Sequence, residues 1–272
     1  MGRRDGAAYR LTEDEIARFR SDGWVHLRGV LADDEVGLLE PVYERFLRRE
    51  IAVPGRDFCD MSADYDKPLD DYSILNVMLP RKHFAAWRGN VYELRAASIA
   101  EQLCGAGMAL DYDQLIAKRP NKPDAVFHWH QDLAYWPVTA DTRTASFWLA
   151  LDASTTANGC VRFVSGSHRE EHLRAHRPLL GDRGKSHTLV ADVDEKRDAI
   201  VAAEIARGDV TVHHERTVHG SAGNRTSGWR RAYIVAFRSR ETVDEERRRG
   251  FTHSHNDAPA VLGSVGVEGG PR

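Results

Sequence analysis

Histidine followed two positions later by Asp or Glu occurs four times in this chain, and such a pair can bind one metal ion from an extended strand. Side chains two apart in a strand project from the same face. His130 and Asp132 meet this condition in the predicted strand 126–132, which apolar residues flank. With His219, in the predicted strand 217–220, they supply two imidazoles and one carboxylate. That set suits Fe(II) and leaves three coordination positions open.

On these three residues alone, a buried hydrogen-bonded network is the alternative interpretation, because buried polar groups need partners. Two further hypotheses bring in additional histidines. The segment His168-Arg-Glu-Glu171-His172 fits the His-x-x-Glu-His pattern of some zinc metallopeptidases, although a preceding turn and a charged continuation favour a solvated face. A non-catalytic, cupin-like binding protein would use three histidines: His128, His130 and His219. Other residues must decide between these hypotheses.

Arg230 follows His219 at the start of a predicted apolar strand, 230–237, where a guanidinium needs an anionic partner. Arginine binds carboxylates through a bidentate fork, so a cation here is what a dicarboxylate cosubstrate beside an iron centre requires. An internal Asp or Glu is the alternative partner, and Arg231 on the opposite face is the competing arginine.

Further polar and aromatic side chains share strand faces with one another or flank the predicted ligands: Gln114, Lys118, Ser146, Phe127, Tyr135, Trp136 and Trp148.

The four aromatic residues of that set can form the walls of a pocket for an apolar or cyclic substrate, and ordinary core packing is their alternative role. Two long segments, 54–82 and 168–186, are the natural lids of such a pocket. We therefore expect residues of these segments to select the substrate.

The elements that must position these residues begin with helices. Thr12 and Glu15 form a capping-box pattern, which predicts a helix over 13–22 that Gly23 closes. The patterns beyond it predict a strand over 24–27, a helix from Asp33 to about Leu47, a long irregular segment over 52–82 and a third helix over 84–103. We expect these helices to cover a sheet.

From residue 108 to about 240, short runs of alternating apolar and polar residues are separated by turn residues, which is the pattern of an antiparallel sandwich or barrel. The predicted strands are 108–118, 126–132, 145–151, 160–164, 187–191, 209–214, 217–220 and 230–237. The tail, 251–272, is rich in Gly, Pro, Ser and His, which predicts a loose segment with His255 and Asp257 in solvent. We therefore expect one domain of mainly β, α+β class, with a helical part over about 11–105 and a β core over about 106–240.

Composition limits the partners. Hydrophobic residues make up 42% of 272 positions, enough for a large core. The formal net charge of -3 argues against nucleic acid or an anionic membrane as a partner. No apolar run approaches the ~18 residues of a spanning helix, and three widely spaced cysteines suit reduced thiols. These features predict a cytoplasmic protein.

Taken together, the motifs resemble the phytanoyl-CoA dioxygenase family, a group of non-haem iron(II)/2-oxoglutarate-dependent oxygenases that includes the ectoine hydroxylases. The resemblance covers most of the chain and depends on the following motifs: Leu11-Thr-x-x-Glu-x-x-x-Phe-x-x-Asp-Gly-Trp-Val25, His130-Gln-Asp132, Trp148-Leu-Ala-Leu-Asp152, Asn158-Gly-Cys160, Ser165-Gly-Ser-His168, Gly208-Asp-Val210, His219-Gly-Ser-x-x-Asn224 and Trp229-Arg230. Val164 departs from the family pattern, which usually has Pro before Gly-Ser-His. This departure affects a turn and none of the expected site residues.

The resemblance implies a double-stranded β-helix with N-terminal helices packed on one sheet. It also implies that His130, Asp132 and His219 bind Fe(II) and that Arg230 binds the distal carboxylate of 2-oxoglutarate. Supplementary cosubstrate contacts are implied for Gln114, Lys118 and Ser146. The implied reaction uses dioxygen (O2), releases succinate and CO2, and hydroxylates an unactivated C–H bond.

Other outcomes stay open within the same resemblance, because the same oxidation chemistry can also epimerise, cyclise or desaturate a substrate. Related halogenases carry a small residue in place of Asp132, so this carboxylate favours oxygenation over halogenation. A balance of 32 arginines to 6 lysines is typical of GC-rich genomes. In bacteria with such genomes the family often modifies natural products, which favours a substrate of that kind.

Overall fold

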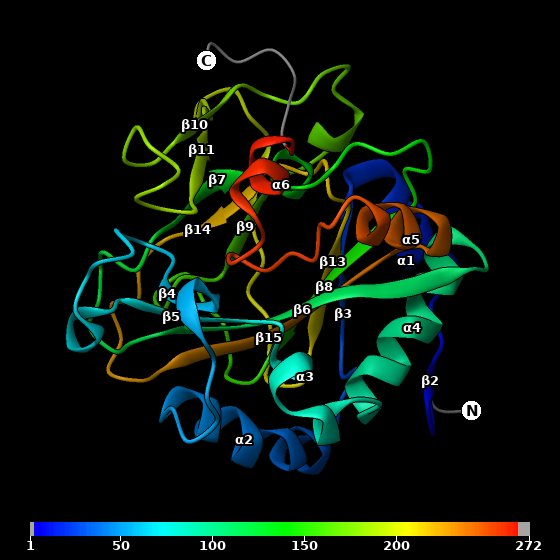
Figure 1. The fold of residues 1–272 in the computed structure, drawn as a ribbon. Helices are drawn as coiled ribbons and strands as arrows, with labels where there is room; N and C mark the ends of the chain where they lie inside the picture. Colours follow the sequence, from blue (N-terminus) through cyan, green and yellow to red (C-terminus); the bar gives the residue numbers. More distant parts are fainter. Residues whose placement is uncertain (1–2, 266–272) are drawn as a thin grey trace.

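The computed structural model describes residues 3–265 and contains a larger and a smaller antiparallel sheet that face each other (Figure 1). The larger sheet has the order β3 (Trp24–Leu27), β13 (Val210–His213), β8 (Thr144–Ala150), β15 (Arg230–Ser239), β6 (Met108–Lys118), β5 (Ile74–Met78) and β4 (Phe58–Asp60). The smaller sheet has the order β12 (Ile200–Ala202), β9 (Val161–Val164), β14 (His219–Ser221) and β7 (Phe127–His130). Two hairpins pair β1 (Arg4–Asp5) with β2 (Ala8–Tyr9) and β10 (His176–Pro178) with β11 (Leu189–Ala191). This arrangement confirms the predicted α+β class and double-stranded β-helix.

Helices α2 (Asp33–Leu47) and α4 (Val91–Cys104) cover the outer face of the larger sheet, on the side away from β7 and β14, and α1 (Glu13–Asp22) adds Phe19 to the same core (Figure 1). The remaining helices are α3 (Pro80–His83), α5 (Arg240–Arg248) and α6 (Pro259–Gly263). Helix α6 lies on the other side, near β7 and β14 (Figure 1). The predicted capping box at Thr12 is present, and Gly23 ends α1 in the left-handed conformation that glycine adopts without strain. Within residues 3–265, no helix is both long and apolar enough to cross a membrane.

Alternation along the central strands builds two separate cores. On β15, Tyr233, Val235 and Phe237 pack against the helices, whereas Ala232 and Ile234 face the smaller sheet. The neighbouring strands β6 and β8 alternate in the same way. The inward face of the larger sheet is therefore the surface that polar residues of these strands share, and it lies opposite β7 and β14.

Two predicted boundaries were wrong in the N-terminal half. The segment expected to be irregular, 52–82, contains β4 and β5, which extend the larger sheet; β5 is buried at every residue, so its sequence shows no alternation. The helix expected over 84–103 begins only at Val91. Gly89 takes a positive φ of 74°, and the Asn90 side chain caps α4 by accepting the Glu93 N–H.

The tail was also predicted wrongly as far as the structure describes it, over 251–265. His253, Ser254 and His255 are buried instead of solvated. The Ser254 hydroxyl donates to both carboxylate oxygens of Asp57 at 2.9 and 2.8 Å, and the His255 N–H donates to the same carboxylate at 2.8 Å. Turn-rich composition does not reveal such hydrogen bonds to distant residues. The remainder of the predicted loose tail, 266–272, lies outside the described residues.

Candidate metal centre

Strand pairing brings the two predicted histidine ligands together. His130 is the last residue of β7, and His219, the first residue of β14, lies directly opposite it in the antiparallel register. A single turn of 3-10 helix, Asp132–Tyr135, begins two residues after His130 and places Asp132 beside both rings. One ligand atom from each of the three residues lies within 4.8 Å of the others, and all three are buried.

The ring orientations suit metal binding. His130 Nδ1 lies 2.7 Å from the carbonyl oxygen of His128, and His219 Nδ1 lies 2.9 Å from that of Thr217. Each Nδ1–H therefore donates to the backbone, so each Nε2 carries a lone pair. Both Nε2 atoms lie 3.6 Å from Oδ1 of Asp132. That separation is too long for a hydrogen bond, which argues against the alternative of a purely hydrogen-bonded network.

The charge states also suit a metal ion. Burial, together with the neighbouring imidazoles, lowers the pKa of His219 well below its usual value, so this ring is neutral. Burial of Asp132 favours its protonated form, but the imidazoles of His219, His130 and His213 outweigh it and hold the pKa of the carboxyl well below its usual range. A neutral imidazole and an ionised carboxylate are the forms that bind metal ions. The donor set of two imidazole nitrogens and one carboxylate oxygen therefore fits Fe(II).

The second oxygen of Asp132 is held by two residues of the larger sheet. Ser146 Oγ donates to Oδ2 at 2.9 Å, and His213 Nε2 lies 3.2 Å from the same atom. His213 on β13 and Ser146 on β8 are direct partners in the strand register. Both were expected to be in strands, but sequence reasoning gave His213 no role and gave Ser146 a cosubstrate contact. The structure adds a hydrogen bond to Asp132 for both.

We expect His213→Phe to weaken Fe(II) binding by about tenfold, because residues that orient metal ligands typically contribute 10- to 100-fold to metal affinity. A titration of the purified protein with Fe(II) under nitrogen measures this. His214→Phe is the matched control, since this neighbouring imidazole contacts the Arg216 N–H. Equal Fe(II) affinity in the His213 variant and the wild type would contradict the positioning role.

Two cavities meet at this triad. The first, called the basic cavity here, is lined by both histidines and Asp132 and by Gln114, Ser146, Trp148, Ser221 and Arg230. The second, called the aromatic cavity, is lined by His130 and Asp132 and by Met78, Phe127, Tyr135, Trp136, His187 and His255. Gln114 and Phe127 line both. The triad therefore lies between a cavity that contains a guanidinium and a cavity walled by aromatic rings.

Two buried basic side chains stand together: Arg230 lines the basic cavity, and Lys118 contacts Ser221, which also lines it. Arg230 is 2% exposed and Lys118 is fully buried, and the two residues are partners in the β15–β6 register. Lys118 Nζ donates to Ser221 Oγ at 2.6 Å, and Arg230 Nη2 lies 3.5 Å from the same oxygen. The Arg230 guanidinium also lies over the ring of Trp148 at 5.0 Å.

These cations lack a carboxylate partner. No Asp or Glu oxygen within residues 3–265 lies in ion-pair range of Arg230 or Lys118, and Arg230 Nε is buried without a hydrogen-bond partner in that part of the chain. Burial lowers the pKa of Lys118 well below its usual value and that of Arg230 to about 10. Uncompensated buried charges are costly, so the site fits an anion such as the distal carboxylate of 2-oxoglutarate.

Arg231, the competing arginine, has a different environment. It faces the helices and pairs with three carboxylates, those of Asp152, Glu40 and Glu44, at 2.7, 2.7 and 2.6 Å. Alternation along β15 therefore gives adjacent arginines opposite roles, and only Arg230 is left for an external anion.

Gln114 lies between the two cavities and donates to Asn76 Oδ1 at 2.5 Å. Asn76 comes from β5, a strand that sequence reasoning missed. Of the four aromatic residues expected at the substrate, Trp148 lines the basic cavity, Tyr135 and Trp136 line the aromatic cavity, and Phe127 lines both.

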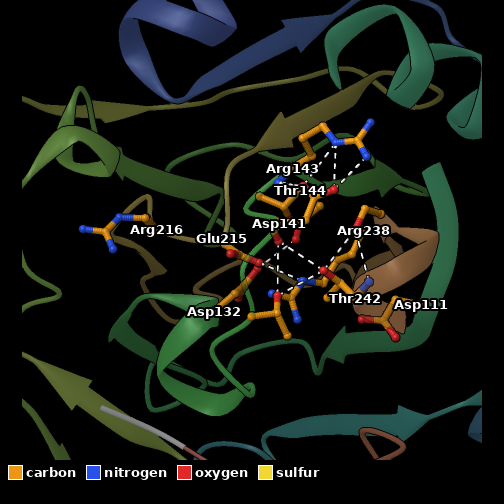
Figure 2. Close-up of polar contacts among 12 residues, drawn as sticks. Asp111, Asp132, Asp141, Arg143, Thr144, Glu215, Arg216, Arg238 and Thr242 are labelled. Carbon is orange, nitrogen blue, oxygen red and sulfur yellow. Dashed lines mark hydrogen bonds and ion pairs between the residues drawn. The ribbon is translucent and has the colours of Figure 1, made fainter. Parts of the chain in front are cut away.

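A buried ionic cluster contacts the loop between His213 and His219. Arg238 Nε lies 3.0 Å from Glu215 Oε2 (Figure 2). Arg238 also pairs with Glu246. The carbonyl oxygen of Glu215 accepts the Leu133 N–H at 3.1 Å. Because Glu215 lies between His213 and His219 in the chain, these contacts join that loop to the turn that begins at Asp132.

The other candidate metal clusters do not suit a metal ion. Glu171 and His172 are 89% and 86% exposed, and the preceding 3-10 helix ends at Arg169, so no helix presents the zinc-peptidase pattern. Asp111, Glu246 and His253 converge within 4.8 Å, but arginines already neutralise the two carboxylates. This second group is an internal ion network.

Comparisons with known proteins agree with this geometry. The sequence model of the family described as Phytanoyl-CoA dioxygenase (PhyH) matches residues 19–232. The chain is 24% identical over 251 residues to the peroxisomal phytanoyl-CoA dioxygenase of Mus musculus. This alignment covers 84% of this chain and 69% of the mouse protein. The structure of EvdO2 from Micromonospora carbonacea var. aurantiaca, complexed with 2-oxoglutarate, superposes with a TM-score of 0.69 and 29% identity, over 85% of this chain and 92% of that one. The epimerase SnoN, in complex with Fe3+, alpha ketoglutarate and nogalamycin RO, gives a TM-score of 0.61 and 25% identity, over 84% and 83%.

Proposed function

Because the chain belongs to the phytanoyl-CoA dioxygenase family of iron- and 2-oxoglutarate-dependent dioxygenases, we propose that it hydroxylates an unactivated C–H bond of a small molecule at the triad His130, Asp132 and His219. The observation that carries this proposal is the position of the triad, where the basic cavity and the aromatic cavity meet. The cosubstrate and the substrate must both reach one metal ion, and each cavity offers one of them a compartment.

We assign the site residues as follows. His130, Asp132 and His219 would hold Fe(II), with Asp132 using Oδ1 because Ser146 and His213 occupy Oδ2. Arg230 and Lys118 would bind the distal carboxylate of 2-oxoglutarate, and Gln114 is a further cosubstrate contact. Bound iron supplies the redox chemistry that couples decarboxylation of 2-oxoglutarate to succinate and CO2 with oxidation of the substrate.

Residues of the chain fix the metal ligands, exclude water from the cosubstrate and line the substrate cavity. The backbone carbonyls of His128 and Thr217 keep both imidazole tautomers fixed, so the ligand set needs little reorganisation. Trp148, Ile116 and Val161 line the basic cavity with apolar surface, which excludes water from the charges of the cosubstrate. The aromatic cavity presents rings to the substrate, with Trp136 and Tyr135 among them.

Epimerisation, cyclisation or desaturation by the same chemistry is the second candidate, and the likeness to the epimerase SnoN favours it. The product separates the outcomes, because hydroxylation adds one oxygen atom to the substrate and the others add none. The complex of SnoN with nogalamycin RO supports a natural-product substrate here.

The mouse relative is named a peroxisomal protein, so the expected cytoplasmic location stays a prediction.

Anaerobic reconstitution tests the proposal. Wild-type protein with one equivalent of Fe(II) should show a metal-to-ligand charge-transfer band only after 2-oxoglutarate is added. Admission of O2 should then bleach the band and release succinate. If neither the band nor succinate forms with Fe(II) and 2-oxoglutarate in excess, the proposed function is wrong.

A further inference from the structure

An outer cavity continues from the aromatic cavity toward the surface. It has a volume of about 480 Å³ and is lined by Arg56, Tyr65, Arg183, His187, His255 and Leu262 among others. The last three of these residues also line the aromatic cavity, which in turn includes His130 and Asp132. Residues shared between neighbouring cavities therefore connect the outer cavity to the triad.

Stacked neutral rings form the boundary between these cavities. His187 stacks on Tyr135 with ring centroids 5.0 Å apart, and on His255 with centroids 3.8 Å apart. Burial lowers the pKa of His187 well below its usual value and that of His255 to about 3, so both imidazoles are uncharged at neutral pH. A flat, neutral passage of this kind suits an apolar or ring-containing molecule more than a charged one.

In contrast to the neutral passage, the outer cavity has charged side chains, because two arginines flank it. The guanidinium of Arg56 lies over the ring of Tyr65 at 4.5 Å, and that of Arg183 lies over Tyr135 at 5.6 Å. Arg56 also donates to the Gly184 carbonyl oxygen at 3.2 Å, which joins the two segments. In the chain from 3 to 265, neither guanidinium has an ion-pair partner within 4.0 Å.

The nearby carboxylates already have other partners. Asp257, which lines the outer cavity, accepts both the N–H and the hydroxyl of Thr252 at 2.6 Å. Asp57 accepts from the Ser254 hydroxyl and the His255 N–H. The two arginines are thus free to bind an external anion, and a guanidinium binds carboxylates and phosphates with a bidentate fork.

We propose that the substrate carries an anionic group, a carboxylate or a phosphate, which Arg56 and Arg183 hold in the outer cavity while its uncharged part passes the rings of Tyr135, His187 and His255 toward the triad. The proposal rests on the proposed function, and it deepens that function by naming the chemical class of the substrate. Each of the two predicted lids, 54–82 and 168–186, contributes one of the arginines.

A matched pair of fluorescent probes tests the charge requirement. 1-Anilinonaphthalene-8-sulfonate is an aromatic anion, and N-phenyl-1-naphthylamine has the same rings without the charge. Both are titrated into anaerobic protein loaded with Fe(II) and 2-oxoglutarate. We expect Arg56→Gln/Arg183→Gln to weaken binding of the anionic probe by about ten- to a hundredfold and to leave the neutral probe unchanged. Lys185→Gln, an exposed lysine next to the outer cavity, is the control and should alter neither.

Competition identifies the anion and separates the possible failures. Phenylacetate and phenyl phosphate are each used to displace the anionic probe, and the stronger competitor shows whether a carboxylate or a phosphate is preferred. Absent binding of the anionic probe to the wild type, or equal binding to the double variant, would overturn the inference. A weaker affinity for 2-oxoglutarate in the double variant would also overturn the inference, since the arginines would then bind the cosubstrate.

The charge-transfer band separates failure of this inference from failure of the proposed function. If any of these outcomes occurs while the wild type still shows the band, the proposed function survives. If the wild type shows no band, both the inference and the proposed function are wrong.

Discussion

Asp132→Ala is expected to abolish the charge-transfer band and to lower succinate formation by on the order of a thousandfold. Asp132 would supply the one anionic ligand of the proposed metal site, and its Oδ1 lies 3.6 Å from both imidazole Nε2 atoms. Removing one partner of a buried charged set costs about 3–5 kcal/mol, which corresponds to that factor. Ser146 and His213 would also lose the oxygen that they hold. Absorption spectroscopy under nitrogen and a succinate assay in air measure the two effects.

Asp141→Ala is the control for this variant. Asp141 lies in the polar cluster behind the triad and pairs with Arg143, whose guanidinium is part exposed (Figure 2). Exposed ion pairs contribute about 1 kcal/mol or less, so this variant should keep the full band. A band of wild-type intensity in Asp132→Ala would show that another residue binds the metal.

The pair of His130 and Asp132 could be singled out because its signal is local: the two residues stand two apart among apolar neighbours. The strand expected to carry both residues ends at His130, however, and a 3-10 turn brings Asp132 to the same site. Arg230 could be predicted for a similar reason, since a charge at the start of an apolar strand needs a partner wherever the strand lies. Both inferences required the strand but not its neighbours.

The role of His213 could not be predicted because it depends on strand pairing. His213 reaches Asp132 only because β13 pairs with β8, which places His213 opposite Ser146. The contact of Gln114 with Asn76 likewise depends on β5, a strand whose uniform burial hides it from pattern analysis. Register between distant strands is set by the whole sheet and not by spacing within one segment.

The C-terminal segment shows the same limit for loops. His255 was expected in solvent because its neighbours are turn residues, yet Asp57, far away in the sequence, holds it in place. The buried position of His255 makes it part of the site, because it lines both the aromatic cavity and the outer cavity. Predicted lids and a predicted tail thus meet around one passage, which no single segment indicated.

Arg230→Met is expected to raise the concentration of 2-oxoglutarate needed for half-maximal band intensity by roughly a hundredfold. The guanidinium is buried over Trp148 with no carboxylate in ion-pair range among residues 3–265, so its charge is available to the cosubstrate. Loss of a buried charged contact to a ligand typically costs about 2–5 kcal/mol. Lys118 stays in place, and for that reason some affinity should remain.

Arg231→Met separates a binding role from a structural one, because the same substitution is made one position along the strand. Arg231 neutralises Asp152, Glu40 and Glu44, so its loss should lower the thermal midpoint while the affinity for 2-oxoglutarate stays within about twofold of wild type. Arg230→Met should show the reverse: weak cosubstrate binding with Fe(II) affinity intact, as measured by titration without 2-oxoglutarate. If the two variants lose 2-oxoglutarate affinity equally, the effect comes from general destabilisation of β15, and Arg230 has no special role in binding the cosubstrate.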